Sequence, residues 1–170
     1  MEIGVLLGVG VATREAIAPT EVLENALGIR AIRLGTSAAT VTGHDPAHRF
    51  EIDAHYSVSR PRVVVIPGGF GALEASVDAR LVSWLDGLIG AGSAVLTVST
   101  GSLLACATGR LVGQSVAGHW LCTTHVRALG SIPSPYPMET YGRVVTTSGT
   151  AAALGGAAFI ADLARWGPMP

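Results

Sequence analysis

Cysteine is scarce in this sequence of 170 residues, which contains only Cys106 and Cys122. Two cysteines are too few for a disulfide framework, and they lack the paired spacing of a zinc site. Charged residues make up 14% of the chain, the formal net charge is −1, and basic residues form no run. These features argue against nucleic acid and anionic membranes as partners, so we expect the partner to be a small molecule.

Long apolar runs are also missing. No stretch without glycine or polar residues reaches the roughly 18 residues that cross a bilayer. The apolar segment 3–9 has no basic residues before it and is soon followed by Arg14 and Glu15, which is not the pattern of a signal peptide. Together with the low cysteine content, this pattern predicts a cytoplasmic protein.

Apolar residues, by contrast, make up 49% of the chain, and there are 22 glycines. This composition suits buried parallel strands joined by tight turns. Short β-rich runs alternate with longer amphipathic segments, which predicts an α/β fold with a mostly parallel sheet and helices on both faces. At this length, and without a repeat or linker, residues 1–170 are expected to form a single domain.

The expected elements follow from the apolar runs and the turn residues between them. Strands are predicted at Ile3–Leu7, Ile29–Leu34, Val63–Ile66, Ala94–Val98 and Val144–Thr147. Helices are predicted at Pro19–Leu27, Asp78–Gly90, Thr100–Thr108, Cys122–Leu129 and Thr150–Arg165. Residues 35–61 are expected to form a small hairpin or a loop, and residues 166–170 a frayed end.

The segment Ala94–Ala105 is the most informative part of the chain, because a buried strand meets a helix there with Ser99 at the junction. This pattern is typical of a nucleophile elbow, which lifts one residue above the carboxyl edge of the sheet and aims helix amides at it. Those amides would stabilise negative charge on the nucleophile or on a bound oxygen. The alternative is that Ser99 is an ordinary helix N-cap.

Two further segments would complete such a site. A strand runs into Pro67-Gly68-Gly69-Phe70, where glycine allows close backbone approach, so Gly69 and Phe70 would present N–H groups to an oxyanion. The same residues also fit a simple turn. His119 follows the junction by about twenty residues and is a natural proton shuttle if it lies beside Ser99, although a lone histidine is more often structural.

The order and spacing of these motifs resemble the ThiJ/PfpI superfamily, which is similar to class I glutamine amidotransferases. The matching features are the Pro-Gly-Gly turn, the elbow with Thr-Gly, the Leu-Leu-Ala helix, the Gly-Arg-Leu-Val-Gly turn and His-Trp. The isonitrile-hydratase-like branch is the most similar. The segment from Glu15 to Leu23 looks like the family's first loop and helix, and residues 142–149 like its closing strand, so the resemblance covers nearly the whole chain.

The resemblance implies a role for each residue of the site. Ser99 would hold the nucleophile position, Glu15 would be the carboxyl group that touches it, and His119 its neighbour. Amides of Gly69, Phe70 and Thr100 would bind an oxyanion. The family is cofactor-independent and often dimeric, so no cofactor, no metal and a homodimer are expected. Its members include hydratases, glyoxalase-like enzymes, amidohydrolases, peptidases and ligand-sensing domains.

The sequence departs from the family most clearly at Ser99, where a cysteine is usual. A helix N-terminus can lower the pKa of a thiol into the neutral range but not that of a hydroxyl, so a serine needs an oriented base. Glu15 and Glu139 are candidates to orient His119 for that task. Three explanations for the serine are open. It was substituted deliberately to trap a substrate, the natural enzyme uses hydroxyl or carboxylate chemistry, or the chain is a binding module that has lost catalysis.

Two other departures concern the walls of the site. Ala117-Gly118 stands where the family usually has two threonines, which predicts a roomier wall and a larger or more apolar substrate. Ala153-Leu154-Gly155-Gly156 stands where relatives often place an aspartate, so one orienting carboxylate is absent. Trp120 and Tyr136 would line the substrate pocket, with an aromatic covering at the core edge as the equal alternative.

For the remaining residues that could take part in chemistry, we favour structural roles or exposure to solvent. Both cysteines are expected to be packing residues, although Cys122 lies close enough to His119 to border the pocket. A histidine-rich stretch invites a metal site, but Pro46 interrupts its helical spacing, so solvated loop histidines are favoured. The residues of that stretch are His44, Asp45, His48, Asp53 and His55.

Taken together, the sequence predicts a flavodoxin-like, doubly wound α/β domain with a pocket at the strand ends. The expected function is a cofactor-independent hydrolase or hydratase acting on a small carbon–nitrogen or carbonyl substrate through residue 99. The alternatives are a non-catalytic ligand-binding or chaperone-like domain, and a metallohydrolase built on the histidine-rich stretch.

Overall fold

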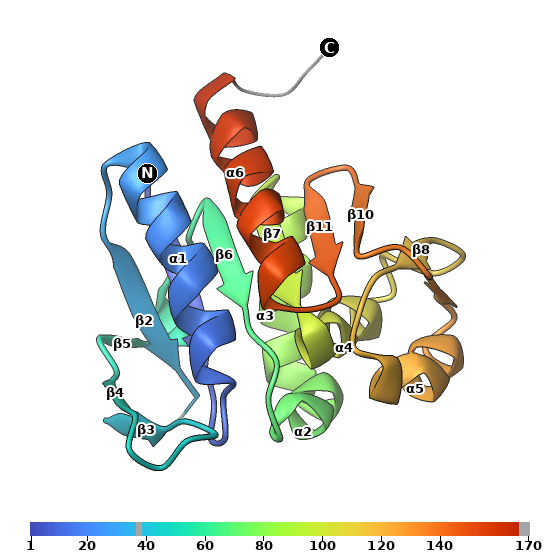
Figure 1. The fold of residues 1–170 in the computed structure, drawn as a ribbon, viewed down its shortest axis with the longest axis horizontal. Helices are drawn as coiled ribbons and strands as arrows, with labels where there is room; N and C mark the ends of the chain where they lie inside the picture. Colours follow the sequence, from blue (N-terminus) through green and yellow to red (C-terminus); the bar gives the residue numbers. More distant parts are fainter. Residues whose placement is uncertain (37–38, 167–170) are drawn as a thin grey trace.

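The computed structural model describes residues 1–36 and 39–166, and its centre is one seven-stranded sheet (Figure 1). The strand order is β10-β11-β7-β6-β1-β2-β5, and every neighbouring pair is parallel except β10 with β11. The strands are β1 (Ile3–Leu7), β2 (Ala31–Gly35), β5 (Ala54–His55), β6 (Val63–Ile66), β7 (Ala94–Val98), β10 (Met138–Tyr141) and β11 (Val144–Thr147). The predicted α/β, doubly wound fold is thereby confirmed.

Helices cover both faces of the sheet (Figure 1). The long helices α1 (Thr13–Leu27) and α6 (Thr150–Trp166) pack against each other on one face. The other face carries α2 (Ala72–Val77), α3 (Ala79–Gly90) and α4 (Ser102–Ala107), and α5 (Thr123–Ala128) lies beyond α4.

Successive side chains of a strand point to opposite faces of the sheet, and this divides the core into two halves. In β1, Val5 and Leu7 belong to the apolar cluster under α1 and α6, whereas Leu6 belongs to the cluster under α3 and α4. A strand that is buried on both sides reads as a continuous apolar run. This is why the central strands could be recognised in the sequence.

Helix α1 begins at Thr13, six residues before the predicted start at Pro19, so that boundary was wrong. The Ala12 carbonyl accepts hydrogen bonds from the amides of Glu15 and Ala16 and thereby starts the helix. Within a helix, proline removes the bond to the carbonyl four residues earlier, and its ring crowds that carbonyl. At Pro19 that carbonyl belongs to Glu15 in the first turn, so the helix continues through it.

The predicted hairpin within residues 35–61 is formed by β3 (Thr40–Thr42) and β4 (Arg49–Glu51), which pair antiparallel. Short elements that the sequence did not predict include α2, β8 (Ser115–Val116), β9 (Ile132–Pro133) and a 3-10 turn at Trp120–Cys122. Helix α6 extends through Trp166, and the frayed end expected after it falls on residues 167–170, outside the described residues. Among the helices of the described residues, none has the length and apolar character needed to cross a membrane.

The parallel strands end along the lower edge of the sheet in Figure 1, whereas β10 runs the other way. At this edge β1 lies between β2 and β6, so the connections leaving β1 and β6 depart in opposite directions. Parallel α/β sheets form ligand crevices at such switch points. The loops after β1, β6 and β7 meet there and carry the predicted site residues.

Candidate active site

Ser99 sits on a strained bend directly after β7. Its φ is 58°, and it is the one non-glycine residue with left-handed backbone among the described residues. Residues with a side chain pay about 1–2 kcal/mol for this conformation. A 3-10 turn over Ser99–Gly101 then leads into α4, with Val98 at the N-cap position. The backbone therefore has the form of the predicted elbow, and the N-cap interpretation of Ser99 was wrong.

The carboxyl group of Glu15 lies beside this bend. Its Oε2 accepts a hydrogen bond of 2.8 Å from the Gly68 amide. Burial raises the pKa of Glu15 above its ordinary value, while the Gly68 amide, the Ser99 side chain and the charge of His119 act to lower it. The structure thus brings the first loop, the elbow and the His119 segment to one place.

Gly68 is the residue that allows this approach. A Cβ atom at position 68 would stand 2.7 Å from both Glu15 Oε2 and Thr100 Oγ1. The Gly68 carbonyl also accepts a bond of 2.9 Å from the Ala12 amide, just before α1. One glycine therefore holds the start of α1 while leaving room for Glu15, and the sequence pointed to the Gly-Gly turn without showing which glycine does so.

The amides of Gly69 and Phe70 have partners within the protein. Gly69 donates to Thr100 Oγ1 at 3.0 Å, and Phe70 donates to the Gly10 carbonyl at 3.2 Å. Binding an oxyanion to either amide would require one of these bonds to break. Close approach does explain Gly69, because a Cβ there would stand 2.8 Å from the Cα of Val11.

His119 is held by its own backbone neighbourhood. Its Nδ1 accepts a hydrogen bond of 3.2 Å from the Leu121 amide, so the neutral ring carries its proton on Nε2. A serine hydrolase needs the opposite arrangement, with Nδ1–H donating to a carboxylate and Nε2 accepting from serine. Glu139, a candidate orienting group, instead accepts a bond of 2.5 Å from Ser134. The arrangement is not that of a serine-type triad.

The wall at Ala117-Gly118 is filled on the side to which a Cβ of Gly118 would point, although Gly118 also lines the cavity beside His119. A Cβ at Gly118 would stand 2.6 Å from Ser102 Oγ and 3.2 Å from Cys122 Sγ. Ser102 donates to the Ser99 carbonyl at 3.1 Å, and burial raises the pKa of the Cys122 thiol. Side chains from α4 and the turn before α5 thus occupy the space that smaller residues vacate.

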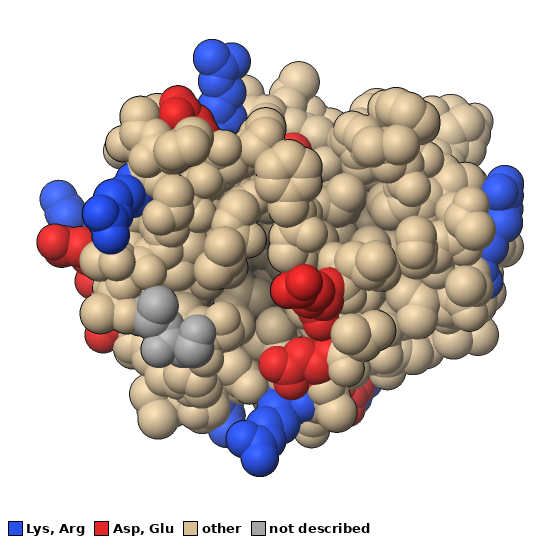
Figure 2. All heavy atoms as spheres, turned by 90° about the horizontal axis from the view of Figure 1, so that it is seen from below, with Lys and Arg blue, Asp and Glu red and all other residues tan. Residues whose placement is uncertain are grey.

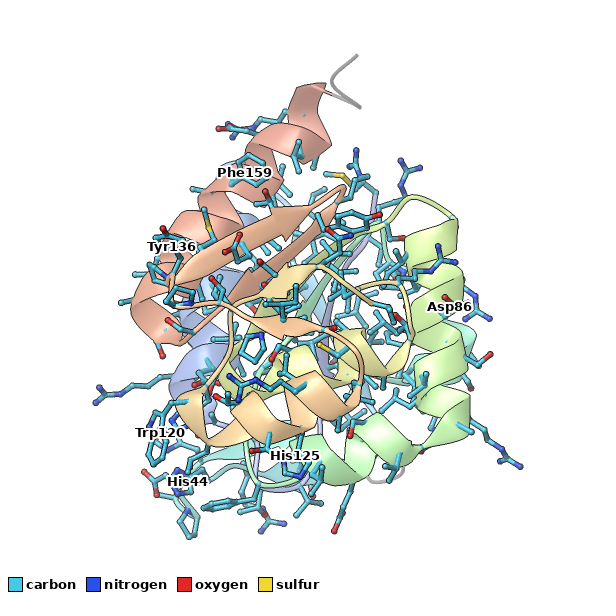
Figure 3. The ribbon with its side chains drawn as sticks, turned by 90° about the vertical axis from the view of Figure 1, so that its right-hand side faces the viewer. His44, Asp86, Trp120, His125, Tyr136 and Phe159 are labelled. Carbon is cyan, nitrogen blue, oxygen red and sulfur yellow. The ribbon has the colours of Figure 1, made fainter. Side chains whose placement is uncertain are left out.

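Ser99 itself is 5% exposed, so only a small reagent reaches it. Figure 2 views the edge where the strands end and shows a hollow near its middle, with acidic side chains beside it. Next to the elbow, a cavity of about 590 Å³ is lined by His119, Trp120 and Tyr136 among others. Trp120 is 75% exposed and projects outward at the lower end of the molecule (Figure 3).

The histidine-rich stretch divides into separate local contacts. His48 Nδ1 lies 3.1 Å from Asp45 Oδ2, Asp53 pairs with Arg33, and His55 Nε2 lies 2.7 Å from the Thr36 carbonyl. Over residues 1–36 and 39–166, no three histidine, cysteine or acidic residues gather as a metal site. His44 and His48 lie in the turn between β3 and β4, as expected for loop histidines, whereas His55 ends strand β5.

Comparison with known proteins places the chain among relatives of this fold. The sequence matches the model of the DJ-1/PfpI family over residues 1–161, and no curated protein matches it. A ThiJ/PfpI domain protein from Brachyspira murdochii has a TM-score of 0.86 at 19% identity, with 96% of this chain and 95% of that chain covered.

Two other solved structures show the same fold. A THiJ/PfpI family protein from Pseudomonas syringae has a TM-score of 0.80 at 23% identity, covering 99% of this chain and 76% of that one. DJ-1beta from Drosophila melanogaster has a TM-score of 0.83 at 20% identity, covering 95% and 90%. At these identities the likeness establishes the fold alone.

Proposed function

The chain belongs to the DJ-1/PfpI family, and we propose that it is a cofactor-independent hydrolase or hydratase acting on a small carbon–nitrogen or carbonyl substrate through residue 99. The observation that carries the proposal is the left-handed backbone of Ser99, with φ of 58°, next to a carboxyl group of raised pKa. Backbone strain persists only where the surroundings impose it, and it gathers at active sites. A perturbed carboxyl beside it is a second feature of such sites.

In the proposed reaction, the side-chain oxygen of Ser99 bonds to the electrophilic carbon of the substrate, and its proton passes to the Glu15 carboxylate. The π electron pair moves onto the substrate nitrogen or oxygen, where the Thr100 amide and the following helical turn stabilise the charge. Glu15 then returns the proton to that atom, to the leaving nitrogen of an amide, or to the attacked carbon of an isonitrile. An amide expels its protonated nitrogen as the free amine at this stage. Water, deprotonated by the same carboxylate, then attacks the carbon, the bond to the Ser99 oxygen breaks, and Glu15 returns the proton to that oxygen.

His119 serves in this scheme as a hydrogen-bond donor through Nε2, because the Leu121 amide occupies Nδ1. Glu15 is therefore the base. A carboxyl whose pKa lies above its ordinary value takes up and returns a proton closer to neutral pH. Trp120 and Tyr136 contact the substrate from the neighbouring cavity, and an isonitrile hydratase is one enzyme of this class.

Serine makes the reaction slow. The hydroxyl cannot be converted to a strong nucleophile by helix amides alone. Loss of a covalent nucleophile costs up to roughly a millionfold in rate. We therefore expect the chain to turn over substrate far more slowly than a variant with cysteine at position 99.

A second candidate function is a non-catalytic ligand-binding or chaperone-like domain. It is favoured by the state of His119, whose Nδ1 accepts a backbone amide, so that Ser99 lacks the oriented imidazole of serine hydrolases. Tight binding of a small amide or aldehyde by calorimetry, with no product by mass spectrometry, would favour this candidate.

We also propose that the chain acts as a homodimer on a small-molecule substrate, without nucleic acid, membrane, metal or cofactor. Exposed apolar side chains along β10 and α6 support self-association, since such groups mark interfaces when they cluster. Tyr141 is 48% exposed and Phe159 36%. Light scattering coupled to gel filtration tests the oligomeric state.

The central experiment is Ser99→Cys, treated with iodoacetamide and analysed by peptide mass spectrometry. We expect rapid alkylation at residue 99 and release of hydrolysed or hydrated product from a panel of amides, isonitriles and aldehydes. Glu15→Gln in the same background should slow both. The buried thiols Cys106 and Cys122 are internal controls and should stay unmodified in the native protein. No alkylation and no turnover at position 99 would contradict the proposal.

A further inference from the structure

A second cavity, of about 590 Å³, opens on the α1 side of Glu15. Three parts of the fold build its wall: the first turn of α1, the first residue of α6, and the turn between β3 and β4. The side chains used below are those of Thr13, Arg14, Glu15, His44, Asp45 and His48. Glu15 lines this cavity and also approaches Ser99, so the cavity and the elbow share one side chain.

The β3–β4 turn is fixed against the site by several bonds. The His44 amide donates to the Val11 carbonyl at 2.7 Å, and the Gly43 amide donates to the His48 carbonyl at 2.9 Å. The His44 ring packs edge-on against Phe70, with ring centroids 4.7 Å apart. His44 therefore bridges the two loops that flank Glu15, and Figure 3 shows it at the same end of the molecule as Trp120.

Some charged side chains around the cavity have hydrogen-bond or ion-pair partners within the protein, and others do not. Asp45 accepts the Ala47 amide at 3.0 Å and meets the His48 ring at 3.1 Å, so its carboxylate already has partners within its own turn. Among the ion pairs of the described residues, Arg14 has no carboxylate partner. Glu15 is the other acid here, and burial raises its pKa above the ordinary value.

Hydrogen-bond donors add to this imbalance. The Thr13 hydroxyl is buried without a partner among the described residues, a state that costs free energy until something bonds to it. Helix α1 starts after Ala12, which provides no side-chain cap, and Thr150 at the start of α6 also lines the cavity. The positive ends of the two longest helices thus open onto one space.

We propose that this cavity binds a carboxylate group of the substrate through Arg14, His44 and the amides at the start of α1. The inference rests on the proposed function and narrows it: the substrate is a small carboxylic acid that also carries the reactive carbonyl or carbon–nitrogen group. Arg14 and His44 select the anionic end, while Ser99 and Glu15 act at the other end.

Two alkylating reagents that differ in one group test this selection. Iodoacetate and iodoacetamide both alkylate thiols, but only iodoacetate carries a carboxylate. In Ser99→Cys, we take the ratio of the iodoacetate rate to the iodoacetamide rate at residue 99 and divide it by the same ratio for free cysteine. This normalised ratio should be about two to five, the size expected of one partly exposed charge contact. Arg14→Gln or His44→Gln in that background should return the ratio toward one.

A charge-matched variant separates the local contact from net charge. Arg127 is exposed on α5, so Arg127→Gln removes the same charge elsewhere and should leave the ratio unchanged. Circular dichroism checks that each variant is folded. Alkylation by both reagents with a ratio near one, unaffected by Arg14→Gln, would overturn the carboxylate site and leave the proposed function standing. No alkylation by either reagent would overturn both.

Discussion

The Gly68 amide donates a hydrogen bond of 2.8 Å to Glu15 Oε2, joining two residues that are 53 positions apart in the sequence. The bond links the loop after β6 to the first turn of α1. It also explains why no side chain is accommodated at position 68, where a Cβ would stand 2.7 Å from the Glu15 and Thr100 side chains. The position of the carboxyl group therefore depends on a residue that has no side chain.

Gly68→Ala should displace Glu15 or Thr100. We expect a loss of about 1–3 kcal/mol in unfolding free energy from overpacking. Alkylation of Ser99→Cys should slow on the order of a hundredfold, because small misplacements of reacting groups are costly. Denaturant unfolding and iodoacetamide kinetics measure the two effects. Gly8→Ala, where a Cβ meets nothing within 4 Å, is the control and should change neither; equal effects of the two variants would contradict the argument.

The central architecture could be predicted because each buried strand is a self-contained signal. β6 and β7 are apolar on both faces, so their positions follow from composition along a few residues. A hairpin or a loop was expected at β3–β4 from the turn residues there. In contrast, the start of α1 depends on Ala12, whose amide bonds to the Gly68 carbonyl in the loop after β6, and such a contact is not visible in a local window.

The site shows the same division. The sequence predicted that Ser99, Glu15 and His119 share one site, and the structure places the three residues near one another. Two properties of the site needed coordinates: the hydrogen bond from Leu121 that sets which nitrogen of the neutral His119 ring carries the proton, and the filling of the space beside Gly118 by Ser102. Both depend on what a neighbouring segment places there, so a residue read alone does not show them.

Backbone strain at Ser99 leads to a prediction about two substitutions. Both Ser99→Gly and Ser99→Ala remove the hydroxyl, but only glycine adopts φ near 58° without a steric penalty. Glycine also loses more backbone entropy on folding, which offsets part of this advantage. We therefore expect Ser99→Gly to be more stable than Ser99→Ala by about 0.5–1 kcal/mol. Denaturant unfolding measures the difference. Higher stability of the alanine variant would mean that the bend is not strained.

His119 also caps the 3-10 turn at Trp120–Cys122 by accepting from the Leu121 amide. Asparagine can accept the same bond, whereas alanine cannot. We expect His119→Asn to keep the wild-type stability and His119→Ala to lose about 0.5–2 kcal/mol. Both should slow alkylation of Ser99→Cys to a similar extent if the ring acts through Nε2–H. A slower reaction in the alanine variant alone would assign His119 a structural role only.

Adjacent glycines in α6 should respond oppositely to alanine. At Gly155 a Cβ meets nothing within 4 Å, whereas at Gly156 it would stand 2.9 Å from Leu96 Cδ1 and 3.2 Å from Val145 Cγ1. Gly155→Ala should stabilise the protein by about 0.4–1 kcal/mol, because alanine lowers the conformational entropy of the unfolded chain. Gly156→Ala should lose that gain to overpacking, at a cost of about 1–3 kcal/mol. Thermal and denaturant unfolding of the pair check this, and a gain at both positions would contradict the packing of α6.

The raised pKa of Glu15 makes stability depend on pH in a defined direction. Its ordinary value is 4.5, and burial raises it in the folded protein. The folded state therefore holds the proton more tightly than the unfolded state. The associated stability is present below the unfolded pKa and is lost as the pH rises through the folded pKa.

Glu15→Gln removes this dependence while still accepting the Gly68 amide. The melting temperatures of the wild type and Glu15→Gln should be closest near pH 4, and the variant should gain on the wild type as the pH rises to about 8. Glu21→Gln, at an exposed position of the same helix, controls for net charge. A wild type that gains on Glu15→Gln with rising pH would mean that hydrogen bonds to the carboxylate outweigh its burial. Glu15 would then be a fixed anion and could not return a proton to substrate near neutral pH.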